Sequence, residues 1–182
     1  ERLSPVFTDI ESNLCLNPDS ILENITDSTR AVMFVGIGGN PGRLNEIKEI
    51  CEEYNLKLIL DGAHMAGTFV KKNKEISHVG SEADVSIFSF QAVKNLPTAD
   101  SGMICFKSEE LDDYARKLSW LGIDKDTFSR ATTGTYKWKY DVPYVGFKYH
   151  GNSIMASIGL VQLKYLDEDN DIRNQNYRKY KK

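Results

Sequence analysis

Residues 31–61 read AVMFVGIGGNPGRLNEIKEICEEYNLKLILD, and this stretch decides the fold class. The apolar run Ala31–Val35 predicts a strand covered on both faces, and Leu56–Leu60 predicts a second strand. Between them, apolar side chains recur at helical spacing over residues 44–51, so we expect a helix that ends near Tyr54. A strand, a helix and a strand in this order are typical of α/β proteins with a mostly parallel sheet flanked by helices.

The same alternation continues on both sides of this unit. We expect further strands at residues 5–10, 85–90 and 103–106, and helices at residues 18–25, 109–118 and 153–180. The apolar stripe of the last helix consists of Ile154, Ile158, Val161, Leu163 and Leu166.

Residues 124–149 have a different character. They are rich in Thr, Tyr, Lys and Gly and lack periodicity, which predicts a long irregular segment on the substrate side. Its candidates for contacts to a nucleotide are Arg130, Tyr136, Trp138 and Tyr140, and packing of these aromatic side chains is the alternative.

Length and composition exclude several classes of protein. The chain has 182 residues, 41% hydrophobic and 27% charged, which suits one globular domain with a hydrophobic core. The net charge of −3 gives no reason to expect nucleic acid or a membrane surface as a partner. The cysteines, Cys15, Cys51 and Cys105, lie far apart, so we expect buried thiols and a cytoplasmic location.

A cluster of glycines follows the first strand of residues 31–61. A dinucleotide fingerprint requires G-x-G-x-x-G at this place, where backbone amides approach a pyrophosphate. Gly36 and Gly38 fit that pattern, but Pro41 stands at its third glycine. The cluster therefore favours a turn with positive φ angles over a nicotinamide site.

Polar residues follow the second strand, in Asp61-Gly62-Ala63-His64. Ligands of open α/β sheets bind at the carboxyl ends of the strands, so a carboxylate here is well placed to contact one. The alternatives are a helix N-cap for Asp61 and a structural histidine for His64. No second histidine or cysteine lies near in the sequence, so we expect no metal site.

A lysine leaves the next predicted strand, in residues 88–95, FSFQAVKN. Lys94 is flanked by Val93 and Leu96, and a lysine in apolar surroundings favours the neutral, nucleophilic form that Schiff-base chemistry needs. A solvated loop lysine is the alternative.

Taken together, residues 61–64 (DGAH) and 89–98 (SFQAVKNLPT) resemble the DegT-type sugar-nucleotide aminotransferases. The pattern of that family reads D-x-A-[HQ] at one strand end and S-F-x-x-x-K-N after a later strand. Its members are pyridoxal-phosphate enzymes with the aspartate-aminotransferase (fold type I) architecture. The resemblance runs through nearly the whole chain, including residues 120–124 and 154–163.

The resemblance implies a role for each matching residue. Lys94 would form the internal aldimine and move a proton between the substrate carbon and the cofactor. Asp61 would pair with the pyridinium nitrogen, His64 would lie near the ring hydroxyl, and Ser89 would bind the cofactor phosphate. Gln91 stands where many relatives have histidine, and we expect it beside the substrate.

Two positions depart from the pattern of the family. In many relatives an asparagine of the neighbouring subunit reaches the cofactor phosphate, and the aligned position here is Lys148. A lysine can bind phosphate as a point charge, and an exposed loop lysine is the alternative. The second glycine after the lysine motif is Ser101 in this chain.

The resemblance also predicts the reaction. Dehydratase relatives have histidine at the position of Lys94, so the lysine favours transamination. We expect transfer of an amino group, from glutamate, to a nucleotide-linked keto-sugar in amino-sugar and polysaccharide biosynthesis, catalysed by a homodimer. A nicotinamide oxidoreductase leaves Lys94 without a role. A non-catalytic or truncated relative that binds cofactor or a partner without turnover is the alternative.

The same resemblance predicts the domain organisation. Residues 1–152 would be the cofactor-binding large-domain segment, and residues 153–182 the start of a connecting helix toward a small domain. Members of the family have an N-terminal region before, and a C-terminal small domain after, the part that residues 1–182 resemble, so we expect residues 1–182 to be a segment or a truncated form of such a protein. We therefore expect that the isolated segment is not fully active.

Overall fold

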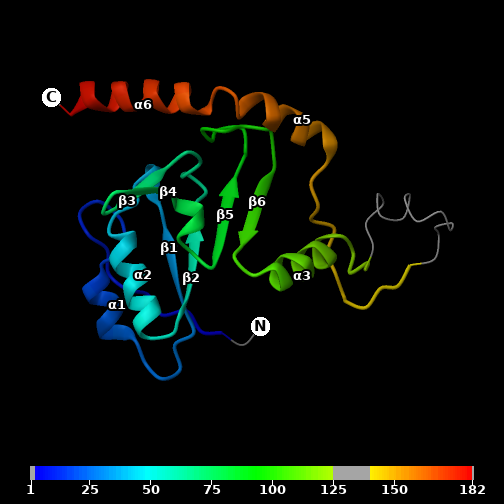
Figure 1. Ribbon diagram of the computed structural model, residues 1–182, viewed down its shortest axis with the longest axis horizontal. Helices are drawn as coiled ribbons and strands as arrows, with labels where there is room; N and C mark the ends of the chain where they lie inside the picture. The colour runs from blue at the N-terminus through cyan, green and yellow to red at the C-terminus, as the bar shows by residue number, and fades with distance from the viewer. Residues whose placement is uncertain (1–2, 125–139, 182) are drawn as a thin grey trace. The chain divides into compact units, whose positions relative to one another are not determined.

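The computed structural model describes residues 3–124 and 140–181, and these residues form two compact units (Figure 1). The first unit combines Glu1–Cys105 with Ser153–Lys182, and the second is Phe106–Asn152. Each unit is described by itself. The predicted division into residues 1–152 and 153–182 stays a prediction.

A four-stranded sheet with the order β1-β2-β5-β6 is the centre of the first unit. Its strands are β1 (Ala31–Val35), β2 (Lys57–Asp61), β5 (Val85–Ser89) and β6 (Gly102–Phe106). The pairs β1–β2 and β2–β5 are parallel, and Figure 1 shows β6 running opposite to β5. The prediction of a mostly parallel sheet is therefore confirmed.

Two helices cover one face of this sheet. Helix α1 (Pro18–Asn24) begins after Asn17, whose side chain accepts a hydrogen bond from the Asp19 amide, and α2 (Leu44–Glu53) follows β1. Both pack their apolar side chains into one core. The core side chains of the strands and of the two helices are Val32, Phe34, Leu58, Leu60, Ile21, Leu44, Ile47, Ile50 and Cys51.

The other face of β1 is open, which corrects the prediction that this strand is covered on both faces. Its residues alternate between exposed and buried, and Met33 is 54% exposed. The reason is that α1 and α2 both pack on the face formed by Val32 and Phe34. A continuous apolar run in the sequence cannot distinguish one covered face from two.

Two more predictions of secondary structure are wrong. Residues 5–10 form no strand, because only Ile10 is paired, in an isolated bridge with Leu16, and the Phe7 side chain is 90% exposed. The predicted helix 153–180 is two helices, α5 (Ser153–Gln162) and α6 (Leu166–Tyr180). Of its predicted apolar stripe only Leu166 is buried.

A hairpin between β2 and β5 was not predicted from the sequence. It consists of β3 (Phe69–Lys72) and β4 (Glu75–His78), which pair in antiparallel fashion. Asn73 in its two-residue turn has a φ of 56°, a conformation that asparagine tolerates better than most residues. Short 3-10 turns at Ile37–Gly39 and Val79–Ser81 complete this part of the unit.

The second unit contains one helix, α3 (Glu109–Ser119), among its described residues. The Ser108 side chain caps α3 by accepting a hydrogen bond from the Leu111 amide at 3.3 Å. After α3, Trp120 forms a bridge with Lys148. The predicted irregular segment falls partly outside the described residues, and its described parts contain no helix.

The three cysteines are free thiols. Cys15 and Cys51 are buried, as predicted, whereas Cys105 is only partly buried, so the prediction is wrong for that residue. Burial raises the pKa of the Cys51 thiol to about 11, so this sulfur stays protonated and unreactive. Over residues 3–124 and 140–181, none of the helices combines the length and the apolar character that crossing a bilayer requires.

Candidate functional site

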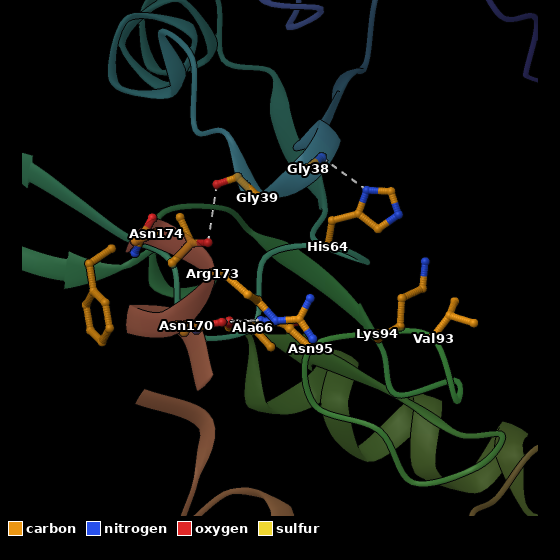
Figure 2. Close-up of a pocket in the computed structure, with 13 residues that line it drawn as sticks. Gly38, Gly39, His64, Ala66, Val93, Lys94, Asn95, Asn170, Arg173 and Asn174 are labelled. Atoms are coloured by element: carbon orange, nitrogen blue, oxygen red, sulfur yellow. Dashed lines mark hydrogen bonds between the residues drawn. The ribbon is translucent and has the colours of Figure 1, made fainter. Parts of the chain in front are cut away.

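A pocket of about 580 Å³ lies in the first unit, where the loops after β1, β2 and β5 meet helix α6 (Figure 2). The carboxyl ends of parallel strands are the expected place for a ligand in an open α/β sheet. The residues that line the pocket are Gly38, Gly39, His64, Ala66, Gly67, Thr68, Phe69, Val93, Lys94, Asn95, Asn170, Arg173 and Asn174. Two of the predicted site residues, His64 and Lys94, are therefore brought together.

The glycine turn after β1 forms one wall and positions His64. The Gly38 amide donates a hydrogen bond to His64 Nδ1 at 3.2 Å (Figure 2), so Nδ1 is the acceptor of this bond and the ring is held in place. Thr68 Oγ1 donates to the Gly39 carbonyl at 3.3 Å. Gly38 has a φ of 61°, as expected for a turn that favours glycine. The glycines therefore act here as a turn that holds a histidine.

The loop after β5 places Lys94. The Phe90 amide donates to the Ser101 carbonyl at 2.8 Å, and the Thr98 amide donates to the Phe90 carbonyl at 2.7 Å, which closes the base of the loop. The Lys94 amide donates to the Gln91 carbonyl at 2.9 Å. Within the described part of the chain the Lys94 side chain has no ion pair. Its amine is therefore available to a ligand.

Two asparagines connect this loop to helix α6. Asn95 Nδ2 donates to the Ala66 carbonyl at 2.6 Å and to Asn170 Oδ1 at 3.1 Å, and Asn170 Nδ2 donates to the same carbonyl at 3.1 Å. Below them Leu166 packs against Ala66 and Leu96. Sequence reasoning missed Asn170, because its partners Asn95 and Ala66 lie 75 and 104 residues away in the chain. The S-F-x-x-x-K-N motif was the only signal for Asn95.

Asp61 and Ser89 end the neighbouring parallel strands β2 and β5. Asp61 lies opposite Val35 and Ile87 in the register of the sheet, and its Oδ1 accepts a hydrogen bond from the Ala63 amide at 3.1 Å. No helix follows Asp61 directly, so the N-cap alternative is wrong. Both residues share the carboxyl edge of the sheet with the pocket, but neither lines it.

The remaining predicted residues are placed as follows. Gln91 Oε1 accepts a hydrogen bond from the Val93 amide at 3.1 Å, so its side chain stabilises its own loop and does not line the pocket. Lys148 belongs to the second unit, where its Nζ lies 3.7 Å from the centroid of the Trp120 ring.

Tyr140 is described and is 40% exposed, whereas the candidates Arg130, Tyr136 and Trp138 lie outside the described residues. Within the described ranges no group of three or more His, Cys, Asp or Glu side chains is arranged to hold a metal ion.

The chain belongs to the DegT/DnrJ/EryC1/StrS aminotransferase family, whose model matches residues 2–182. The family that the D-x-A-[HQ] and S-F-x-x-x-K-N motifs predicted is therefore confirmed.

Individual relatives agree with this assignment. The chain is 35% identical over 166 residues to the spore coat polysaccharide biosynthesis protein SpsC of Bacillus subtilis, which covers 91% of this chain and 41% of SpsC. Spr1654 of Streptococcus pneumoniae in its PMP-form matches with a TM-score of 0.77 at 28% identity, over 91% of this chain and 45% of that one. DesI, solved in the presence of its TDP-sugar product, matches with a TM-score of 0.71 at 26% identity, over 92% and 38%.

These matches confirm the predicted α/β architecture, and this chain spans less than half the length of each of the three relatives. Spr1654 is known in both a PLP-form and a PMP-form, which confirms pyridoxal phosphate as the cofactor of this family.

Proposed function

We propose that this chain is the cofactor-binding part of an aminotransferase that moves an amino group from glutamate to a nucleotide-linked keto-sugar. The observation that carries the proposal is that Lys94 and His64 line one pocket at the carboxyl edge of the sheet, in a chain of an aminotransferase family. The nucleotide-linked substrate is supported by DesI, which was solved with its TDP-sugar product. The name of SpsC supports a place in polysaccharide biosynthesis.

The pocket suits pyridoxal phosphate. Its lining includes the Lys94 amine, which forms no ion pair among the described residues, and the His64 imidazole, whose Nδ1 accepts from the Gly38 amide. The Asp61 carboxylate ends the neighbouring strand β2. When bound, the cofactor supplies an electron sink that makes a proton on the substrate carbon removable. Lys94 Nζ holds the cofactor and moves that proton.

The neighbouring residues support Lys94. The Asp61 carboxylate would pair with the ring nitrogen of the cofactor and favour its charged form. The Ser89 hydroxyl would donate to the cofactor phosphate, and His64 would lie beside the ring. Lys148 would bind the phosphate from the partner subunit of a homodimer, and Gln91 would contact the substrate.

The first experiment uses the full chain with pyridoxal phosphate. A visible absorbance band, and a borohydride-reduced adduct mapped by mass spectrometry to Lys94, are expected in the wild type. Lys74 is an exposed lysine in the turn of the β3–β4 hairpin, so K74A is a matched control that keeps the adduct. K94A loses it.

Turnover tests the substrates. Glutamate and a nucleotide-linked keto-sugar are expected to give an amino-sugar product, and K94A abolishes it. An adduct without turnover on any such sugar would support the non-catalytic alternative. Because the relatives are longer, we expect residues 1–182 alone to be less active than a protein in which they are part of a chain as long as those relatives.

A further inference from the structure

We infer that Arg173 of helix α6 forms an oxyanion subsite, which binds a carboxylate or phosphate group of the ligand that meets Lys94. This inference rests on the proposed function for the identity of that ligand, but the binding of an anion can be tested without it. Lys94 and His64 come from the sequence motifs of the family, whereas Arg173 is brought to the pocket by the fold.

The charge of the pocket is the first observation. Among the described residues, those that line it include two basic side chains, Lys94 and Arg173, and no Asp or Glu. The chain as a whole carries a net charge of −3, so its composition does not predict a cationic cavity. A concave site lined by one sign of charge attracts ligands of the opposite sign.

The orientation of Arg173 is the second observation. Asp169 lies one turn earlier on α6, at the i,i+4 spacing that normally allows an ion pair. Arg43 and Arg116 form such bridges with carboxylates of their own helices or helix ends. Among the described residues Arg173 forms none, and Figure 2 shows its side chain reaching from α6 toward the loop of Asn95 and Lys94.

The rigidity of the surroundings is the third observation. Asn170, one turn before Arg173, donates to the Ala66 carbonyl at 3.1 Å and accepts from Asn95 at 3.1 Å. The helix is therefore fixed against both loops of the pocket at the place from which Arg173 projects. Asn174 also lines the pocket and adds an uncharged amide donor.

The chemistry of the guanidinium defines the ligand class. Its planar array of donors matches the paired oxygens of a carboxylate or phosphate, and such charged hydrogen bonds are stronger than neutral ones. Lys94 is reserved for covalent chemistry in the proposed function, so Arg173 is the other basic side chain of the pocket lining that can bind an anion. In the proposed function that anion has three sources: the carboxylates of the amino donor, the phosphate of the cofactor and the phosphates of the nucleotide-linked sugar.

The direct test is calorimetric titration of the cofactor-free full chain with inorganic phosphate and with glutarate, a dicarboxylate without an amino group. R173Q is expected to weaken the binding of at least one probe by about 10- to 100-fold, which is the change in affinity that the loss of one hydrogen bond to a charged group causes. R173K is expected to restore part of the affinity. R178Q, at an exposed arginine of α6 outside the pocket, is the matched control and leaves both affinities unchanged.

Two further comparisons identify the source of the anion. If Arg173 binds the phosphate of the cofactor, R173Q weakens the binding of pyridoxal phosphate but not the binding of pyridoxal. If the donor carboxylate is bound, R173Q raises KM for glutamate and leaves KM for the keto-sugar unchanged. If the phosphates of the nucleotide-linked sugar are bound, R173Q raises KM for the keto-sugar and leaves KM for glutamate unchanged.

Equal affinities of R173Q and R178Q for both probes would overturn the inference. Failure of the wild type to form an adduct at Lys94 would instead overturn the proposed function, and the titrations would still decide whether the subsite exists.

Discussion

Two histidines of the first unit accept a hydrogen bond from a glycine amide but have different surroundings. His64 Nδ1 accepts from the Gly38 amide, and His78 Nδ1 accepts from the Gly80 amide at 3.1 Å. His64 is exposed and lines the pocket, whereas the His78 ring lies 5.5 Å from the Phe69 ring and 5.6 Å from the Phe88 ring. Burial lowers the pKa of His78. One histidine is therefore available to a ligand, and the other is half-buried against two phenylalanine rings.

We expect this difference to appear in the pH dependence of stability. The pKa of His78 lies below its ordinary value of 6.5 in the folded chain, so at lower pH the unfolded chain binds more protons. The contribution of His78 is therefore complete above about pH 6.5 and is lost as the pH falls through the folded pKa. H78Q, measured by thermal unfolding at a series of pH values, is expected to reduce the fall in Tm below pH 6.5.

The control for this prediction is H64Q, at the exposed histidine, which is expected to retain the wild-type pH dependence. A fall in Tm of H78Q as steep as that of the wild type would show that His78 is not responsible.

At the scale of elements, α6 decides how the two loops of the site are held. Leu166 packs against Ala66 and Leu96, and Asn170 hydrogen bonds to both loops. Gly67 has a φ of 74°, and a Cβ there would lie 2.5 Å from Asn170 Nδ2, so the close approach of α6 requires glycine. The geometry of Lys94 thus depends on a helix that begins seventy residues later.

Replacement of Asn170 by alanine tests this dependence. N170A removes two hydrogen bonds but leaves Asn95 to satisfy the Ala66 carbonyl, so we expect a loss of about 1 kcal/mol in the free energy of unfolding. Hydrogen exchange is expected to accelerate in residues 63–67 and 93–97. Q175A, at an exposed position of α6, is the control. Unchanged exchange in both loops of N170A would show that α6 does not hold them.

At the scale of the first unit as a whole, the sheet has one covered face and one open face. Leu60 is 0% exposed in the core beneath α2, whereas Met33, on the neighbouring strand, is 54% exposed on the other face. The open face also carries Val35 and Ile87. Exposed apolar side chains gathered on one sheet face are typical of a surface that contacts further protein.

Urea unfolding of two variants measures this asymmetry. L60A is expected to lower the free energy of unfolding by about 2–5 kcal/mol, because it leaves a cavity in a packed core. M33A is expected to change it by less than about 0.5 kcal/mol, because the side chain is in water on the open face. A cost for M33A as large as that for L60A would show that further protein covers this face in solution.

Patterns that depend on near neighbours were read correctly from the sequence. The strands β1, β2, β5 and β6 and the helices α1, α2 and α3 lie within a residue or two of their predicted positions. The errors have different causes. Residues 5–10 have strand-forming side chains but no strand beside them, and the helix predicted over 153–180 is interrupted after Gln162. The β3–β4 hairpin was missed because its Asn73 turn lacks the usual glycine.

The sequence by itself determined the family and the α/β alternation. It also identified the motif residues Asp61, His64, Ser89 and Lys94, because the spacing of the apolar runs shows which residues follow the ends of the strands. Only the tertiary structure decided that His64 and Lys94 share one pocket, that Asp61 and Ser89 lie beside it, and that Asn170 and Arg173 belong to it. The physical reason is that the last two residues reach the pocket through helix docking, which hydrogen bonds and packing between distant segments determine and no local pattern encodes.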